Sequence, residues 1–170
     1  MGSRGFSTVE IAAGVAVLGS LLAVAVPAFV RNLHASHLVE ATDGLLRIQQ
    51  GSVAFAAAAA SEARSLPTLP SPAPLTPSTV PRGERLEDPP GAWDHPSWKA
   101  IAFRPVPEGM SHRYAFAIDE RAPGADLVAR AHGDLDGDGV LSRFEVRVEQ
   151  RVAGGEVRAV PGIIVTDELE

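Results

Sequence analysis

Alternating carboxylates near the C-terminal end are the residues whose types and spacing best fit a definite chemistry. Between residues 134 and 145, aspartates stand at every second position, a glycine follows the third, and further oxygen-bearing side chains come later. Calcium prefers about six to eight oxygen ligands, and this spacing wraps them around one centre. Three carboxylates so close together repel one another without a cation. The stretch predicts a Ca²⁺ site with the candidate ligands Asp134, Asp136, Asp138, Val140, Ser142 and Glu145.

The spacing matches the loop of an EF-hand, but the surroundings differ. No helical pattern precedes Asp134, and a strand pattern follows Ser142. We therefore expect a calcium loop inside a β-sheet, with the backbone carbonyl of Val140 as a ligand and Ser142 acting directly or through water. Glu145 either closes the site with both oxygens or lies too far along the strand to reach the ion. The alternative is a solvated Asp–Gly turn without an ion.

A carboxylate beside an apolar run is the second chemical feature. Residues 11–30 carry no charge, and Glu10 stands at the start of the run. As a helix the run would be about 30 Å long, roughly the thickness of a bilayer's hydrocarbon core. A charge there costs a few kcal/mol unless it is paired. An amine is the obvious partner, and cleavage after Gly5 would create one on Phe6.

Residues 4–10, Arg-Gly-Phe-Ser-Thr-Val-Glu, resemble the cleavage and methylation motif of type IV pilins and of the pseudopilins of type II secretion. The family pattern is a short basic leader, a glycine, an aromatic or apolar residue, and a glutamate at the fifth place after the cut. Gly5, Phe6 and Glu10 fit this pattern, and residues 26–29, Val-Pro-Ala-Phe, fit the run that follows. Residues 133–144 are also similar to a segment of pilin-like proteins of myxobacteria.

The resemblance implies that a prepilin peptidase cuts after Gly5 and methylates the new amine of Phe6. It implies that Glu10 pairs with the N-terminus of another pilin subunit during filament assembly, with an inner-membrane assembly platform as a further partner. Helices of the family unwind locally around the proline that matches Pro27, and an ordinary kinked membrane helix is the alternative. The alternative to the whole motif is an uncleaved signal anchor with an incidental glutamate.

The expected location follows from the same residues. Arg4 marks the cytoplasmic side by the positive-inside tendency. Before assembly the chain would cross the inner membrane once, with its domain in the periplasm. Afterwards it would belong to an extracellular or periplasmic filament.

Composition narrows the function classes. The chain has 170 residues, a formal net charge of −6 and a pI of about 5.4, so we expect no nucleic-acid partner, which would need a basic face. It contains no cysteine, which excludes a disulfide framework. Bound calcium would then supply part of the stabilisation that a disulfide gives the C-terminal region in many pilins. Enzyme motifs such as Gly-x-Ser-x-Gly, the Walker loop and His-Glu-x-x-His are missing from the sequence, and we expect no enzyme.

Hydrophobic periodicity predicts the elements that position these residues. Beyond residue 30, apolar residues recur three and four apart and indicate an amphipathic helix. The proline-rich segment that follows predicts a loop. The aromatic cluster around Trp93 and Trp98 predicts core packing, with sugar stacking as an alternative. Alternation with a period of two then predicts strands. The helix stripe consists of Leu38, Ala41, Leu45, Ile48, Ser52 and Phe55, and the strand segments are 113–118, 126–132, 143–150, 156–160 and 163–166.

We therefore expect an α+β, pilin-like fold. A long N-terminal helix, transmembrane and then amphipathic, would pack on an antiparallel β-sheet with a calcium-type loop between strands. The parts would be a leader (1–5), an assembly helix (6–30), its amphipathic continuation (31–65), a Pro-rich loop (66–92) and a β-sheet domain (93–170). Three functions stay open: a pilin or minor pilin, a pseudopilin, and a non-polymerising, single-span anchored calcium-binding module.

Overall fold

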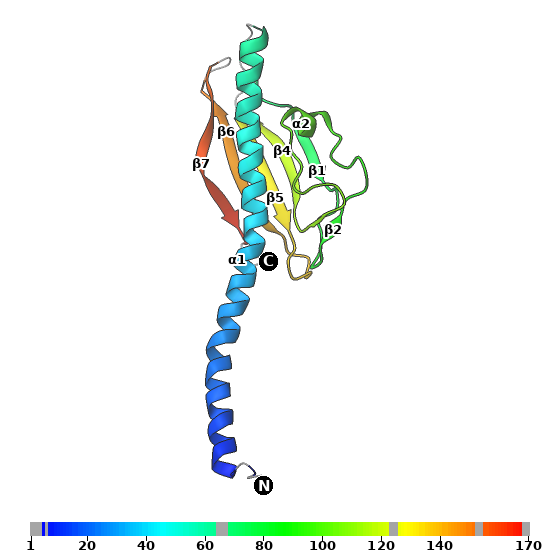
Figure 1. The fold of residues 1–170 in the computed structure, drawn as a ribbon. Helices are drawn as coiled ribbons and strands as arrows, with labels where there is room; N and C mark the ends of the chain where they lie inside the picture. The colour runs from blue at the N-terminus through cyan, green and yellow to red at the C-terminus, as the bar shows by residue number, and fades with distance from the viewer. Residues whose placement is uncertain (1–4, 6, 64–67, 123–125, 152–154, 168–170) are drawn as a thin grey trace. The chain divides into compact units, whose positions relative to one another are not determined.

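The computed structural model describes residues 5, 7–63, 68–122, 126–151 and 155–167, with the main chain alone at residues 30–37, 62–63 and 122. The chain divides into two compact units, Met1–His37 and Leu38–Glu170. Helix α1 (Thr8–Ala63) belongs to both. The fold class is α+β, with an apolar N-terminal helix followed by an antiparallel sheet, as predicted (Figure 1).

Within the described residues, five strands form the main sheet in the order β1-β4-β5-β6-β7, and all neighbours are antiparallel. Their bounds are β1 (Ala73–Thr76), β4 (Ala115–Ala122), β5 (Asp126–Gly133), β6 (Ser142–Gln150) and β7 (Val157–Thr166). A separate ribbon pairs β2 (Leu86–Glu87) with β3 (Ser111–His112), and α2 (Pro96–Ala100) lies between them in sequence. The strict alternation of burial along β6 confirms the predicted period of two.

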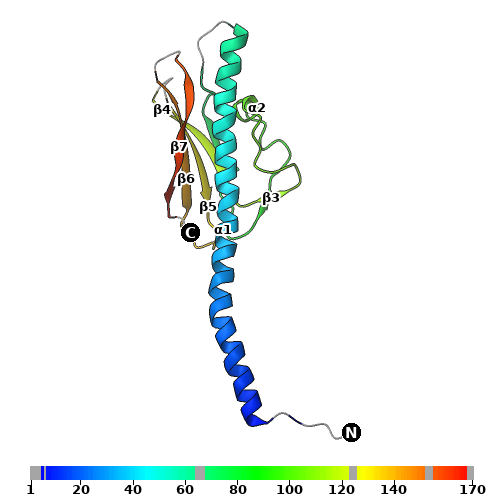
Figure 2. The same ribbon diagram turned by 60° about the vertical axis from the view of Figure 1, so that its left-hand side comes forward.

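The part of α1 inside the second unit lies along one face of the sheet (Figure 2). The predicted stripe is the buried one, since Ala41, Leu45 and Ile48 join one apolar core with inward residues of the sheet. Burying a leucine or isoleucine side chain contributes roughly 1.5–3 kcal/mol. Buried Ser52 satisfies its hydroxyl by donating to the carbonyl of Ile48 at 2.8 Å. The sheet residues in this core include Phe116, Ile118, Phe144, Val146 and Val148.

Gly44 allows the helix to come this close to the sheet. A side-chain carbon added at Gly44 would lie 2.5 Å from the ring of Phe116. Such a distance is shorter than any normal carbon contact, because non-bonded carbons prefer about 3.5–4.0 Å. The absence of a side chain at Gly44 therefore sets the depth to which Phe116 packs against α1.

Strand β7 runs through Pro161 and Gly162, where the sequence had predicted a break. The ladder between β6 and β7 shifts register there, because Glu145 pairs with Ile164 whereas Arg147 pairs with Val160. Gln49 of α1 reaches this irregularity, and its amide donates to the carbonyls of Arg147 at 2.7 Å and Val160 at 3.0 Å. The helix therefore supplies donors where the strand ladder is interrupted.

Strands β1 and β2 lie within residues 66–92, the segment for which the sequence predicted a loop. Strand β1 pairs with β4 along the edge of the sheet, with Ala73 opposite Ile118 and Thr76 opposite Phe116. Prolines conceal such a strand in a sequence, because they cannot donate to a ladder and are tolerated mainly on edge strands. The predicted positions Leu66 and Pro67, at the start of that loop, lie outside the described residues.

We predict that Gly44→Ala destabilises the second unit. The new methyl group would meet the Phe116 ring, and overpacking costs about 1–3 kcal/mol, against a gain of at most about 1 kcal/mol from better helix propensity. Thermal unfolding of the full chain in detergent, followed by tryptophan fluorescence, measures the effect, because Trp93 and Trp98 both lie in this unit.

Gly19→Ala is the matched control. It makes the same substitution in the same helix, at a position where an added carbon meets nothing within 4 Å. Its unfolding midpoint should be no lower than that of the parent chain. A Gly44→Ala midpoint as high as the control's would contradict the packing argument.

Candidate functional site

The first unit contains a segment that is long and apolar enough to cross a membrane. Among the described helices, Thr8–Phe29 of α1 meets this condition by length and composition, and none of it is buried. Its 22 residues give a length of about 33 Å at the usual rise of an α-helix. The hydroxyl of Ser20 bonds to the carbonyl of Ala16 at 2.8 Å, so this polar group is satisfied within the helix.

Glu10 lies in the first turn of α1 and bonds to Ser7. Its carboxylate accepts from the backbone N–H of Ser7 at 2.7 Å and from the Ser7 hydroxyl at 2.8 Å, and the Ser7 hydroxyl accepts from the backbone N–H of Glu10 at 3.3 Å. This reciprocal arrangement is a capping box. The spacing Ser-x-x-Glu before an apolar run is the signature of a capping box, so the sequence already contained this signal, which we had not recognised.

The other residues of the N-terminal motif are Gly5, Phe6 and Pro27. Gly5 is exposed, and Phe6 lies outside the described residues. Pro27 lies inside α1, and the helix continues past it without interruption. Exposure of Gly5 is what a cleavage site requires.

The three aspartates predicted as ligands come together between β5 and β6. One carboxylate oxygen from each of Asp134, Asp136 and Asp138 lies within 4.8 Å of the others. The loop is folded by hydrogen bonds from its own backbone, since Asp138 N–H donates to Asp136 at 3.1 Å and Val140 N–H donates to Asp138 at 2.7 Å. Each aspartate carboxylate thus accepts from a backbone N–H two or three residues further along the chain and stabilises the turn there.

Asp134 anchors the loop to the rest of the unit. It is 2% exposed, and its carboxylate accepts from the backbone N–H groups of Gly137 at 2.7 Å and Gly139 at 3.1 Å. Gly139 has a φ of 96°, which a residue with a side chain rarely adopts. The carbonyl of Asp134 also accepts from the backbone N–H of Gly83 at 2.7 Å. The proline-rich segment is therefore bonded directly to the aspartate loop.

Ser142 and Glu145 have hydrogen-bond partners other than the three aspartates. Ser142 is buried, and its hydroxyl donates to the carbonyl of Gly133 at 3.0 Å, across the base of the loop. Glu145 accepts from the guanidinium groups of Arg130, at 2.7 Å, and Arg143, at 2.8 Å. Burial opposes ionisation of Glu145, but these bonds outweigh it and lower the pKa of Glu145 below its ordinary value.

The aspartate cluster could hold a metal ion. Two oxygens that both ligate one calcium-sized ion at 2.3–2.6 Å lie at most about 5 Å apart, and the separations within this cluster meet that limit. Hard carboxylate oxygens suit cations such as Mg²⁺, Ca²⁺ and Mn²⁺. The geometry therefore supports a cation site formed by Asp134, Asp136 and Asp138, without selecting the cation.

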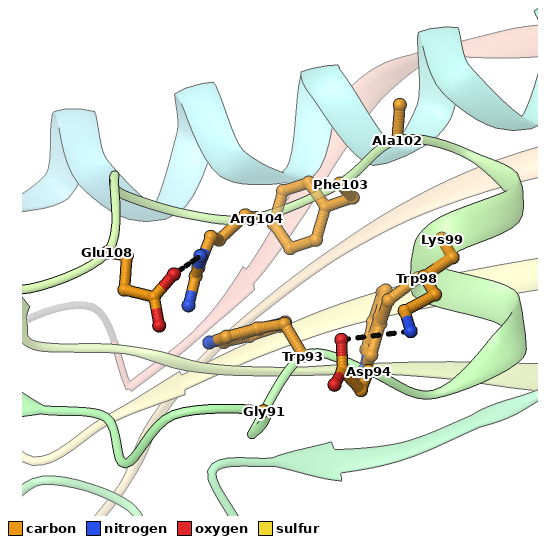
Figure 3. Close-up of a pocket in the computed structure, with 9 residues that line it drawn as sticks. All are labelled: Gly91, Trp93, Asp94, Trp98, Lys99, Ala102, Phe103, Arg104 and Glu108. Carbon is orange, nitrogen blue, oxygen red and sulfur yellow. Dashed lines mark hydrogen bonds and ion pairs between the residues drawn. The ribbon is translucent and has the colours of Figure 1, made fainter.

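A second concave site lies beside α2 (Figure 3). The cavity, of about 330 Å³, has aromatic walls, and ion pairs of Lys99 with Asp94 at 3.0 Å and of Arg104 with Glu108 at 3.2 Å stand at its rim. Trp98 is 0% exposed and Trp93 is 5% exposed. These tryptophans are core residues, as predicted. So little of either indole is exposed that the structure favours core packing over sugar stacking.

No family model, no curated protein and no solved structure matches this chain. A functional assignment therefore depends on the residues and on their geometry. The two features that carry it are the capped carboxylate of the apolar helix and the aspartate loop of the sheet.

His132 should make the free energy of unfolding of the second unit decrease in acid. Burial, together with the nearby guanidinium groups of Arg143 and Arg130, lowers the pKa of His132 below its ordinary value. The folded chain then binds fewer protons at this residue than the unfolded chain. The stabilising contribution is present above the unfolded pKa of about 6.5 and is lost as the pH falls through the folded pKa.

We predict that His132→Gln, which cannot titrate, loses less stability than the parent chain between pH 7.5 and pH 5. Unfolding midpoints of both chains at the two pH values measure the difference. A constant offset caused by the substitution cancels in this comparison. Equal acid losses in the two chains would show that His132 does not contribute.

Proposed function

We propose that this chain is a structural subunit, a pilin or minor pilin, of a type IV pilus-like filament. The observation that carries the proposal is Glu10, a carboxylate in the first turn of an exposed apolar segment that follows Gly5. An apolar helix surface of this length needs lipid before assembly and the helices of other subunits afterwards, because water solvates it poorly. An antiparallel sheet packed on the same helix is compatible with a pilin-like domain.

In this proposal the chain matures by cleavage after Gly5 and N-methylation of Phe6. The new amine of one subunit then pairs with Glu10 of a neighbour, because two opposite charges in an apolar surrounding attract each other strongly. Ser7 and Glu10 both stay in the mature chain, so the same carboxylate can also cap its own helix. In this proposal the apolar helices of many subunits pack together as the core of the filament.

One observation favours a second candidate, a single-span anchored module that never polymerises. The capping box gives Glu10 a role inside its own chain, so the carboxylate does not require a partner subunit. Under this alternative Glu10 stabilises the start of the helix by roughly 0.5–2 kcal/mol, the usual range for a cap. The filament proposal requires the negative charge of Glu10 for assembly. The anchored module requires only the hydrogen bonds by which Glu10 caps its own helix.

We also propose that the cation of the aspartate loop is Ca²⁺. Asp134, Asp136, Asp138 and the carbonyl of Val140 follow the order of ligands in known calcium loops. Glu145 bonds to Arg130 and Arg143, so the loop residues carry the proposal. Bound calcium would neutralise the repulsion among the three carboxylates and stabilise the loop together with the segment attached through Gly83.

Glu10→Gln and Ser7→Ala separate the two roles of Glu10. Glutamine keeps a capping box but removes the charge, whereas Ser7→Ala removes the cap partner and keeps the charge. For a filament subunit we expect Glu10→Gln to be processed and membrane-bound but poorly incorporated, and Ser7→Ala to be incorporated normally. The measurement is the amount of each variant in sheared filaments, with the N-terminus determined by mass spectrometry.

The outcomes of this experiment discriminate between the candidates. Chains that begin at N-methylated Phe6 support the filament proposal. Chains that keep residues 1–5, together with a stronger effect of Ser7→Ala than of Glu10→Gln on helix stability, establish the anchored module instead. Normal incorporation of Glu10→Gln would remove the charge-pairing argument.

For the loop, we predict that calcium raises the unfolding midpoint of the full chain in detergent. A ligand at about one hundred times its dissociation constant adds roughly 2.7 kcal/mol to the free energy of unfolding. Asp136→Asn should abolish the difference between calcium and chelator. The measurement is thermal unfolding in calcium, in magnesium and in chelator.

Asp94→Asn provides the control, because Asp94 is an exposed carboxylate paired with Lys99 at the rim of the α2 cavity. This variant should keep the full calcium effect. Identical midpoints of the parent chain in calcium and in chelator would exclude the calcium site. A larger shift in magnesium than in calcium would assign the cluster to a different cation.

A further inference from the structure

The segment from Asp88 to His112, here called the lobe, leaves the β2–β3 ribbon and returns to it. It contains α2 and the aromatic residues Trp93, Trp98 and Phe103, which contact one another with ring centroids 5.3–5.6 Å apart. Asp88 directly follows β2, and His112 ends β3. These two residues therefore stand where the lobe begins and ends, and a bond between them adds to the β2–β3 pairing that already joins these ends.

His112 is 0% exposed and has an oxygen acceptor at each ring nitrogen. Its Nδ1 lies 2.9 Å from the carbonyl oxygen of Tyr114, and its Nε2 lies 2.7 Å from Oδ2 of Asp88. A carbonyl oxygen only accepts, so Nδ1 must carry a proton. A neutral ring would then turn the lone pair of Nε2 toward an ionised carboxylate at hydrogen-bond distance, which is repulsive. The geometry requires a second proton between Nε2 and Asp88.

Asp88 gives the same result from the other side. Its side chain is 8% exposed, and its Oδ2 also accepts from the indole N–H of Trp93 at 2.5 Å. Burying a carboxylate without a positive charge nearby costs free energy, so buried carboxylates are usually paired with a cationic group. Oδ2 thus collects two donors, and Oδ1 is buried with no hydrogen-bond partner within the described part of the chain. The imidazolium of His112 is the positive charge that this carboxylate contacts.

The charged groups around the pair have other partners. Glu40 of α1 accepts from the backbone N–H of Arg113 at 2.6 Å and lies 3.6 Å from Arg85, which precedes β2. The guanidinium of Arg113 donates to the carbonyl of Gly83 at 3.0 Å. Burial raises the pKa of Tyr114 to about 12, so its phenol stays neutral over the range in which histidines titrate.

We propose that Asp88 and His112 form a proton-dependent clasp, a buried carboxylate–imidazolium pair that fastens the ends of the lobe and loosens it at Trp93 when the proton leaves. Loss of the proton leaves the Asp88 charge buried beside a ring that no longer donates to it. The nearest relief is for Asp88 to turn toward water, and Trp93 then loses the acceptor of its indole N–H. The clasp lies wholly within the second unit and does not depend on the filament proposal.

The protonation of the ring is measured directly by NMR of the full chain in detergent with ¹⁵N-labelled histidine. The His112 signals are assigned from their loss in His112→Asn. In the parent chain at pH 7 we expect both ring nitrogens of His112 to carry protons. In Asp88→Asn, the amide can donate to Nε2, so the ring should be neutral with its proton on Nδ1. Asp94→Asn, a matched change at an exposed lobe residue, should keep both protons.

Release of the lobe is measured by acrylamide quenching of tryptophan fluorescence between pH 7 and pH 10, because the only tryptophans of the chain lie in the lobe. Quenching should rise with pH in the parent chain and in Asp94→Asn, and stay flat in Asp88→Asn. A His112 ring protonated on Nδ1 alone in the parent chain at pH 7 would overturn the proposal. So would a rise in quenching with pH that Asp88→Asn shares.

Discussion

The second unit depends on one packing constraint, the burial of a narrow helix stripe against the inner face of a sheet. Strands β4 to β6 present Phe116, Ile118 and Phe144 on that face, and water would contact them if α1 were removed. The helix stripe covers them. Leu45 and Ile48 are buried in this contact, and the missing side chain of Gly44 lets the helix approach the Phe116 ring. Once this contact fixes the sheet, the aspartate loop between β5 and β6 gains a defined position, whereas the lobe extends from the separate β2–β3 ribbon.

Local patterns in the sequence were sufficient for most elements. The helix stripe and the alternation along β6 repeat within a few residues, so each could be predicted without knowledge of the tertiary structure, and both are confirmed. Strand β1 was missed because its proline, Pro74, contradicts strand propensity, and only an edge position next to β4 makes it acceptable. The break predicted at Pro161 and Gly162 is confirmed in part: β7 continues through these residues, but its register with β6 shifts there, and Gln49 from a distant part of the chain donates to a carbonyl on each strand.

The candidate sites likewise contain features that local spacing predicts and features that depend on the tertiary structure. The cluster of Asp134, Asp136 and Asp138 arises from bonds that span at most five residues, and its spacing predicted it. The position of Glu145 depends on the register that sets it opposite Arg130 on the neighbouring strand, which the sequence does not reveal. The capping box of Glu10 was readable from its spacing and was overlooked.

The amide of Gln49 also has a mechanical consequence. It holds carbonyls of two adjacent strands at once, and Gly44 fits under one particular ring. If the sheet were pulled along the axis of α1, both fits would have to fail together, because a shift of one helical turn, about 5.4 Å, moves Gln49 off its acceptors and brings a larger residue onto Phe116. A force perpendicular to the sheet would separate the same contacts one after another. The interface should therefore resist shear more strongly than peeling.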